Sequence, residues 1–194
     1  MKRKNTAILI FDEVEVLDFA GPFEVFSVTD ELSDYQRLNV YTVAREVKPV
    51  SCRNGLSANP DYSIENAPPP DILIIPGGEG TRTVMGQDDV IAWILKSAMT
   101  AEKIMSVCSG ALILAKAGLL KGLRATTHHQ VFDTLESIAP ETEIVKGQRF
   151  IDNGKIATSA GISAGIDLSL YVIEQLFGAE ISDSTADYME YSRG

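Results

Sequence analysis

The sequence predicts an α/β fold, a three-layer sandwich in which a mostly parallel central sheet lies between two layers of helices. Two observations predict it. Short continuous apolar runs, typical of strands buried on both faces, recur along the chain, and segments with helical periodicity alternate with them. The chain has 194 residues and contains no repeat, low-complexity segment or linker, so residues 1–194 are expected to form a single domain.

Three apolar runs in the first half of the chain predict buried strands: 6–11 (TAILIF), 38–44 (LNVYTVA) and 71–75 (DILII). A helical segment is expected over 22–27, because proline suits the first turn of a helix and Pro22 opens this stretch. Residues 47–59 are polar and rich in β-forming types, which predicts a hairpin-like excursion between the second and third strands.

The second half continues the alternation of strands and helices. The expected elements are a helix over 87–99, a strand over 104–107, a helix over 109–117, a short strand with its loop over 124–129, a helix over 132–137, a hairpin over 150–161 and a helix over 164–177. Gly118 and Gly178 end two of these helices, and Asn153-Gly154 is the expected turn of the hairpin.

Composition and charge exclude several classes of protein. Hydrophobic residues make up 45% of the chain and charged residues 23%, which is too apolar for a disordered protein. The formal net charge of -10 opposes the approach of nucleic acid and of anionic membranes, so the expected partner is a small molecule or a protein. No apolar stretch approaches the ~18 residues of a membrane span. The apolar run near the N-terminus ends at Asp12, too early for a signal peptide, and the cytoplasm is the expected location.

Cys108 is the strongest candidate for a reactive side chain. The sequence SVCSG places it at a turn from a strand into a helix, with small residues two positions away on either side, as in a nucleophile elbow. The positive end of the following helix is expected to lower the pKa of the thiol, and backbone N–H groups at the turn are expected to stabilise charge on a substrate. Inert burial, the usual state of a free cysteine, is the alternative, and we favour the nucleophile.

Asp18 and a pair of glycines are expected at the same edge of the sheet as Cys108, because ligands of open α/β sheets bind outside the carboxyl ends of the strands. Asp18 follows the first predicted strand, and Gly77 and Gly78 follow the third. Asp18 is either a proton carrier that faces the thiol or the N-cap of the helix near Pro22, and the residues alone favour neither. The glycines allow a close approach of the backbone to a ligand, with an ordinary turn as the alternative.

Other candidate residues are given structural roles. His128 and His129 are the only histidines, and since neighbours on an extended segment point to opposite faces, at most one is expected to face the site. Cys52 has no helix after it, and Glu24 is expected on a helix face or as a structural carboxylate. Two cysteines make no disulfide framework, no residues have the spacing of metal ligands, and the glycines match no nucleotide-binding motif, so no metal is predicted.

Four blocks of the sequence resemble the ThiJ/PfpI superfamily, also called class I glutamine amidotransferase-like, over nearly the whole chain. They are ILIFDEVEVLDFAGPFEVF, DILIIPGGEGTR, SVCSGALILAKAGLLKGLRATTHH and TSAGISAGIDLSLYVIEQLFG. Within this superfamily the chain is most similar to isocyanide (isonitrile) hydratases and to the sensing domains of AraC-type regulators. The resemblance implies a flavodoxin-like, glutamine amidotransferase-like fold and a homodimer, whose closing segment the tail TADYMEYSRG resembles.

The resemblance also implies roles for particular residues. Cys108 corresponds to the nucleophile and Asp18 to the acid beside it. Ser109 matches a hydroxyl residue that hydrogen-bonds near the reacting group, and Gly78 matches a glycine whose backbone amide faces the substrate. The implied activity is that of a carbon-oxygen lyase: the Cys108 thiolate attacks the terminal carbon of an isocyanide, and Asp18 supplies a proton and activates water to release an N-substituted formamide. This reaction needs no cofactor.

Two other functions stay open. A ligand or redox sensor would use the site without turnover; since AraC-type sensing domains precede a DNA-binding region, a sensor that ends at Gly194 would act through a partner. Deglycases, glyoxalases and related hydrolases use the same thiol but usually carry glutamate in place of Asp18. Protease and amidotransferase functions are disfavoured, because Ser109 rather than histidine follows the cysteine. Hydratases commonly have tryptophan at the position of His129, so the shape of the pocket is left open.

Overall fold

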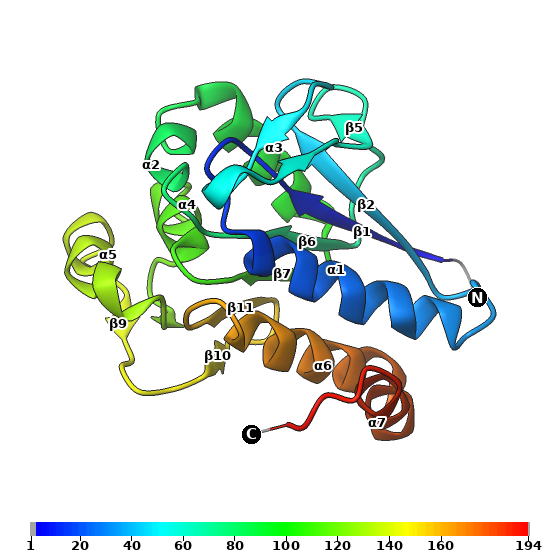
Figure 1. The fold of residues 1–194 in the computed structure, drawn as a ribbon. Coiled ribbons are helices and arrows are strands. Elements are labelled where there is room, and N and C mark those ends of the chain that lie inside the picture. Colours follow the sequence, from blue (N-terminus) through cyan, green and yellow to red (C-terminus); the bar gives the residue numbers. More distant parts are fainter. Residues whose placement is uncertain (1–2, 194) are drawn as a thin grey trace.

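The computed structural model describes residues 3–193. Seven strands within this range form one central sheet, in the spatial order β10-β11-β7-β6-β1-β2-β5 (Figure 1). The strands are β1 (Lys4–Leu9), β2 (Leu38–Ala44), β5 (Tyr62–Ser63), β6 (Ile72–Ile75), β7 (Lys103–Ser106), β10 (Phe150–Asp152) and β11 (Ile156–Ser159). Neighbours pair in parallel, except that β10 runs antiparallel to β11. The sheet is therefore mostly parallel, as the sequence predicts.

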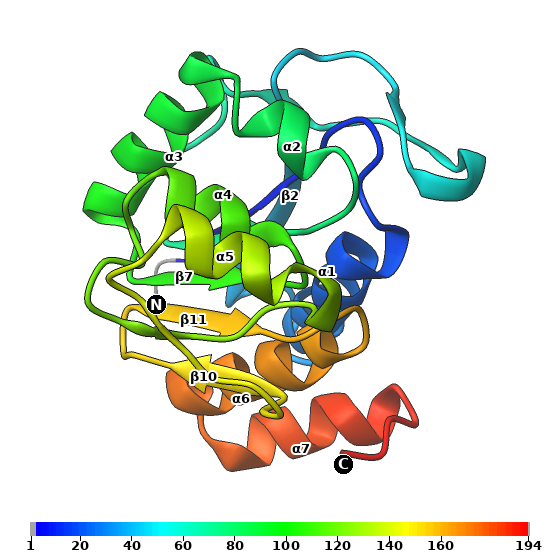
Figure 2. The same cartoon turned by 90° about the vertical axis from the view of Figure 1, so that its left-hand side faces the viewer.

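Helices cover both faces of this sheet (Figures 1 and 2). One layer contains α1 (Val16–Glu31), α6 (Ala164–Phe177) and α7 (Ala179–Tyr188), and the other contains α2 (Thr81–Val84), α3 (Asp88–Thr100), α4 (Gly110–Lys116) and α5 (Phe132–Ile138). Successive strand residues alternate between the layers: Ala7 and Leu9 of β1 pack with the α3 and α4 layer, and Ile8 packs with the α1 and α6 layer. The predicted three-layer α/β sandwich is confirmed.

Two hairpins extend this core. The expected excursion is formed by β3 (Val50–Ser51) and β4 (Ser57–Ala58), which pair antiparallel around a 3₁₀ turn at Arg53–Gly55. It projects from the body of the molecule, as the cyan segment at the right of Figure 2 shows. The second hairpin, β10 with β11, is also present. The predicted short strand is β8 (Arg124–Ala125), and it pairs with β9 (Glu143–Ile144), a strand that the sequence pattern did not indicate.

The first helix begins earlier than its sequence predicts. It starts at Val16, so Pro22 lies inside it and removes one backbone hydrogen-bond donor. Burial of Phe19, Val25 and Phe26 in the core offsets this loss, because each side chain of this size contributes about 2 kcal/mol when buried. The prediction that the helix starts at Pro22 was therefore wrong: the apolar residues before the proline decide where the helix begins.

The last helix, α7, was not predicted either. Its fully buried residues are Ser182, Thr185 and Ala186, and Ile181 is the large aliphatic side chain that packs against the core, so its apolar pattern is weak in the sequence. The Thr185 hydroxyl is 3.0 Å from the Thr29 hydroxyl of α1, which ties α7 to the core through a polar contact. Across residues 3–193, the helices are too short or too polar to cross a membrane.

Candidate active site

The carboxyl ends of β1, β6 and β7 lie side by side in the middle of the sheet. The chain runs outward from β1 to β2 and returns to β6 on the other side of β1, and a reversal of this kind leaves a crevice where α/β proteins bind ligands. Asp18 follows β1, Gly77 and Gly78 follow β6, and Cys108 follows β7. The structure brings these four residues together.

Cys108 occupies a strained turn between β7 and α4. Its φ angle is 56°, in the left-handed region that residues other than glycine rarely adopt. Its N–H donates to the Ala160 carbonyl at 3.1 Å and its carbonyl accepts from Thr127 Oγ1 at 2.7 Å, so neighbouring loops hold this conformation. At Gly110, a Cβ atom would lie 2.1 Å from the Ile75 carbonyl oxygen, so only glycine fits. The turn has the geometry predicted for a nucleophile elbow.

Asp18 faces Cys108 from the first turn of α1. Glu15 occupies the N-cap position of this helix, so the alternative that Asp18 is an N-cap was wrong. The Asp18 side chain is fully buried. Oδ2 accepts the Gly77 N–H at 3.0 Å, and Oδ1 has no nitrogen or oxygen partner within residues 3–193. The Cys108 thiol lies within hydrogen-bonding reach of the carboxyl. Burial and then the charge of Glu15 raise the pKa of Asp18 to about 7. Asp18 can therefore exchange a proton near neutral pH.

The Cys108 thiol is held in its protonated form. Burial, followed by the negative charge of Asp18, raises the pKa of the thiol to about 12, although the N–H groups of Ser109 and Ile162 hydrogen-bond to the sulfur and oppose this shift. The start of α4 does lower this pKa as expected, through the Ser109 N–H, but burial outweighs it and the net shift is upward. Transfer of the thiol proton to Asp18 is the direct route to a thiolate here.

Ser109 and Gly78 bond to each other. The Gly78 N–H donates to Ser109 Oγ at 3.0 Å, and that hydroxyl lies 3.2 Å from the Gly78 carbonyl. The Gly78 amide thus donates to a hydroxyl that lines the cavity, and the expectation that it faces a substrate stays a prediction. Gly78 has a φ angle of 125°, and a Cβ there would lie 2.2 Å from the Glu13 carbonyl oxygen, so the turn requires glycine. Both residues line the cavity above Cys108.

This cavity has a volume of about 490 Å³ and is rich in charged side chains. Beside the thiol it is lined by Glu15, Arg53, Glu79 and Arg82. Nothing in the sequence pattern pointed to these four residues. Glu79 directly follows Gly78 and Glu15 lies three residues before Asp18, so both could have been found by extending the strand-end reasoning. Arg53 reaches the cavity from the β3–β4 hairpin, whose position depends on tertiary packing.

Both histidines line the same cavity, so the expectation that at most one faces the site was wrong. The segment is not extended here but forms a 3₁₀ turn at His129–Val131, and the rings of His128 and His129 lie 4.2 Å apart. Burial, and then the charge of His129, lower the pKa of His128. His128 Nδ1 accepts the Gln130 N–H at 3.3 Å, so the neutral ring carries its proton on Nε2. Neither ring hydrogen-bonds to the thiol within residues 3–193.

Cys52 and Glu24, which were also given structural roles, do not line this cavity. Cys52 is buried in the core layer that contains α1 and α6, and Glu24 is exposed on α1. Residues 3–193 contain no group of three or more His, Cys, Asp or Glu side chains that could hold a metal ion. The chemistry available at this edge of the sheet is therefore that of a thiol, a buried carboxyl and the charged side chains above them.

Comparison with known proteins identifies the family. The model of the DJ-1/PfpI family matches residues 4–175, which include the thiol, the buried carboxyl and both strand-end glycines. The chain belongs to the DJ-1/PfpI family. Isonitrile hydratase from Pseudomonas putida is 34% identical to it over 187 residues, which are 95% of this chain and 77% of that protein.

The DJ-1/PfpI relatives of this chain also include a regulator. The HTH-type transcriptional regulator GbdR from Pseudomonas aeruginosa is 25% identical over 190 residues, which are 98% of this chain but 51% of the regulator, so the chain spans about half of its length. Among solved structures, a ThiJ/PfpI family protein from Pseudomonas syringae superimposes with a TM-score of 0.90 at 29% identity, covering 100% of this chain and 77% of that one. The resemblance to ThiJ/PfpI proteins is confirmed, and the family context contains both an enzyme and a regulator.

Proposed function

We propose that this DJ-1/PfpI protein is a cysteine-dependent hydratase that converts an isocyanide to an N-substituted formamide. The observation that supports it most is the pairing of the Cys108 thiol with the Asp18 carboxyl, whose pKa is raised to about 7. Addition of a thiol across a carbon centre needs a group that takes up and returns a proton near neutral pH, and Asp18 meets that need. The similarity to isonitrile hydratase over most of the chain supports the substrate class.

In the first step, the Asp18 carboxylate accepts the thiol proton while Cys108 Sγ attacks the terminal carbon of R–N≡C. The S–C bond forms, and Asp18 delivers the proton to the same carbon. The product is a thioimidate, R–N=CH–S–Cys108, and the carboxylate is regenerated. The N–H groups of Ser109 and Ile162, which hydrogen-bond to the sulfur, stabilise the negative charge that it carries during proton transfer.

In the second step, Asp18 removes a proton from water as the water oxygen adds to the thioimidate carbon, and it passes this proton to the nitrogen. Collapse of the tetrahedral carbon breaks the C–S bond and releases R–NH–CHO. The hydroxyl proton returns to the sulfur through Asp18. Isocyanide and water supply every atom of the product, so the reaction as written uses no cofactor. Ser109 and Gly78 act as positioning residues, because their mutual hydrogen bonds fix the turn that presents Gly77 to Asp18.

Turnover of a small alkyl isocyanide by the purified protein tests this proposal, with the formamide measured through its formyl proton by NMR. The wild-type protein is expected to form formamide and Cys108→Ala to form none above the uncatalysed rate. Cys52→Ala is the matched control, because it removes the other thiol, which is buried in the core and does not line the cavity, and it is expected to keep turnover. If the wild-type protein produces no formamide while mass spectrometry shows Cys108 reduced, the hydratase proposal is wrong.

A ligand or redox sensor is the second candidate, favoured by the match to the regulator GbdR over 98% of this chain. A redox sensor is expected to oxidise reversibly at Cys108 in mild peroxide, which peptide mass spectrometry would detect. An unoxidised Cys108 under conditions that oxidise Cys52 counts against this function. Incubation with methylglyoxal covers the glyoxalase alternative, which would produce lactate where a hydratase produces none.

A further inference from the structure

The walls of the cavity above Cys108 do not suit a purely hydrocarbon substrate. Pockets for apolar ligands are lined mostly by apolar and aromatic side chains. Here Val131 and Ile162 are the large aliphatic side chains in the lining, while two arginines, two glutamates and two histidines contribute most of the rest. The part of a substrate that lies above the reacting carbon therefore meets charged groups.

Arg53 has the weakest pairing of the arginines within residues 3–193. Its guanidinium forms no side-chain hydrogen bond to a described residue, and the nearest acidic oxygens, on Glu15 and Glu79, are both 3.7 Å away. Every other arginine in this range has an acceptor atom at 3.4 Å or less. A guanidinium can offer a carboxylate two parallel N–H bonds, so Arg53 keeps donors for an anionic ligand.

The position of Arg53 is set by the hairpin that carries it. The Arg53 N–H donates to the Val14 carbonyl at 3.0 Å, which docks the hairpin on the segment that also carries Glu15. Both neighbouring glutamates also interact with other groups. Arg82 forms an ion pair with Glu79 at 2.7 Å, and the Glu15 carboxylate lies close enough to the buried Asp18 to act on its charge. Within residues 3–193, Arg53 therefore stands at the rim of the cavity as a cation whose two acidic partners, Glu15 and Glu79, are no closer than 3.7 Å.

We propose that the substrate carries a carboxylate on its R group and that Arg53 binds this carboxylate while the isocyanide carbon reaches Cys108. This inference rests on the proposed hydratase function and narrows its substrate class to anionic isocyanides. Arg53 is then a specificity residue: it acts on substrate binding and leaves the proton transfers between Asp18 and Cys108 unchanged.

Matched acids and esters test this proposal. Isocyanoacetate, 3-isocyanopropanoate and 4-isocyanobutanoate are each compared with their methyl esters, which share the carbon chain but lack the charge. For the chain of best-fitting length, kcat/KM of the acid is expected to exceed that of the ester by roughly tenfold, because charge-assisted hydrogen bonds are stronger than neutral ones. The difference is expected mainly in KM, since Arg53 does not contact the reacting atoms.

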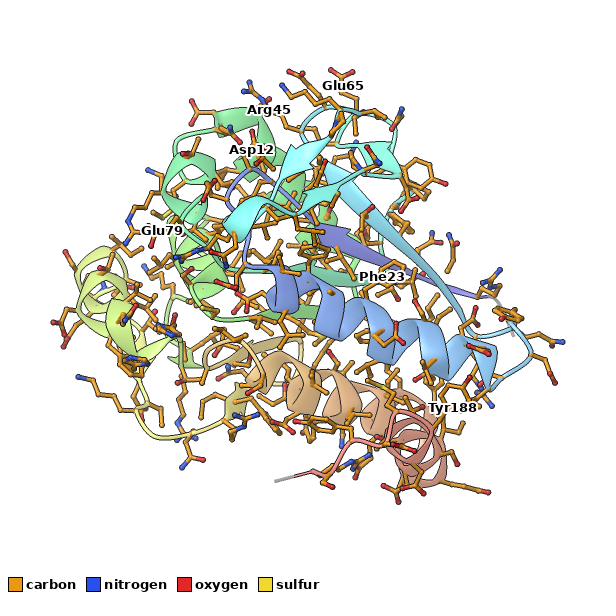
Figure 3. All side chains as sticks on the ribbon, in the orientation of Figure 1. Asp12, Phe23, Arg45, Glu65, Glu79 and Tyr188 are labelled. Carbon is orange, nitrogen blue, oxygen red and sulfur yellow. The ribbon has the colours of Figure 1, made fainter. Side chains whose placement is uncertain are left out.

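Variants of Arg53 then assign the effect. Arg53→Met is expected to raise KM for the acid, to leave KM for the ester unchanged and so to remove the preference, and Arg53→Lys is expected to keep part of it. Arg45→Met is the matched control, because Arg45 pairs with Asp89 at 2.6 Å and lies at the top of Figure 3, well away from Glu79. This control is expected to behave as wild type with both substrates.

Calorimetric binding of the products separates the two proposals. If neither acids nor esters are hydrated, the hydratase function is wrong. An anion site at Arg53 would still be supported if the protein bound N-formylglycine more tightly than its methyl ester and Arg53→Met lost this difference. Equal binding of acid and ester overturns the anion site, even where both isocyanides are hydrated. So does an acid preference that survives in Arg53→Met, or a stronger preference for an amine-bearing isocyanide.

Discussion

The two cysteines of this chain are both buried, but only one has surroundings suited to chemistry. Cys52 is 1% exposed and belongs to the core cluster that contains Val14 and Phe26, whereas Cys108 is 8% exposed and lines the cavity. Burial is the largest cause that raises the pKa of each thiol. A low thiol pKa therefore does not distinguish the nucleophile here. What distinguishes Cys108 is a carboxyl within hydrogen-bonding reach, a strained turn and an opening to a cavity.

Asp18 is what gives Cys108 a proton acceptor that Cys52 lacks within residues 3–193. Replacement of Asp18 is therefore expected to have the largest effect on the rate of hydration. Asp18→Asn keeps the size of the side chain and an acceptor for the Gly77 N–H but cannot take up the thiol proton. It is expected to lower kcat/KM for isocyanide hydration by roughly 10²–10⁴-fold, the range for loss of a general acid-base group.

The pH profile of the wild-type protein sharpens the same test. The carboxylate is the form that accepts the thiol proton, and the pKa of Asp18 is about 7, so kcat/KM is expected to rise with pH and to level off above that value. The residual activity of Asp18→Asn is expected to lack this rise of kcat/KM with pH. If kcat/KM of the variant rose with pH in the same way, the titrating group would be a different one and Asp18 would not carry the proton.

The same substitution, Asp18→Asn, is expected to raise the stability of the protein although it lowers the activity. The folded pKa of Asp18 is about 7 against an ordinary value of 3.8, so between these values the unfolded chain ionises while the folded protein stays protonated. Ionisation of Asp18 therefore lowers the free energy of unfolding as pH rises from about 4 to about 7. Asp18→Asn removes this cost and is expected to be more stable than wild type by roughly 2–4 kcal/mol at pH 8 but not at pH 4.

Urea denaturation of both proteins at pH 4 and pH 8 measures this difference. Glu24→Gln is the matched control, because Glu24 lies on the same helix but is exposed, and it is expected to change stability by the same small amount at both pH values. A gap between wild type and Asp18→Asn that is the same at both pH values would contradict the raised pKa.

The sequence predicts the layers and the edge of the site well, for a local reason. Buried parallel strands are short apolar runs, and the residue that follows such a run lies at the ligand-binding edge wherever the strand sits in the sheet. Asp18 and Cys108 could therefore be placed at one edge before their strands were known to be close neighbours. The start of α1 was missed because Pro22 is a strong local signal that the packing of Phe19 and Phe26 overrides.

The electrostatics of the site could not be predicted in the same way. The direction of the Cys108 pKa shift depends on burial by several separate segments, which no local motif records. Arg53 reaches the cavity from a hairpin that docks on a distant segment, through the Glu13 N–H to the Ser51 carbonyl at 2.7 Å and the Arg53 N–H to the Val14 carbonyl at 3.0 Å. The orientation of His128 and His129 follows from a 3₁₀ turn that has no clear pattern in the sequence.

The rates of alkylation compare the two cysteines directly. The change expected on substitution of Asp18 is smaller here than the change in hydration activity. In native protein at pH 8, iodoacetamide is expected to modify Cys108 before Cys52, because only Cys108 lines the cavity, and peptide mass spectrometry would give both rates. Asp18→Asn is expected to speed modification of Cys108 several-fold, since the Asp18 charge raises the pKa of the thiol and its removal increases the thiolate fraction.

The same substitution is thus expected to slow hydration and to speed alkylation. Alkylation needs only a thiolate and an opening, whereas hydration also needs a group that returns the proton to carbon and activates water. If Asp18→Asn slowed both reactions equally, Asp18 would act by shaping the turn around Cys108. If Cys52 reacted first in native protein, access through the cavity would not be what separates the two thiols.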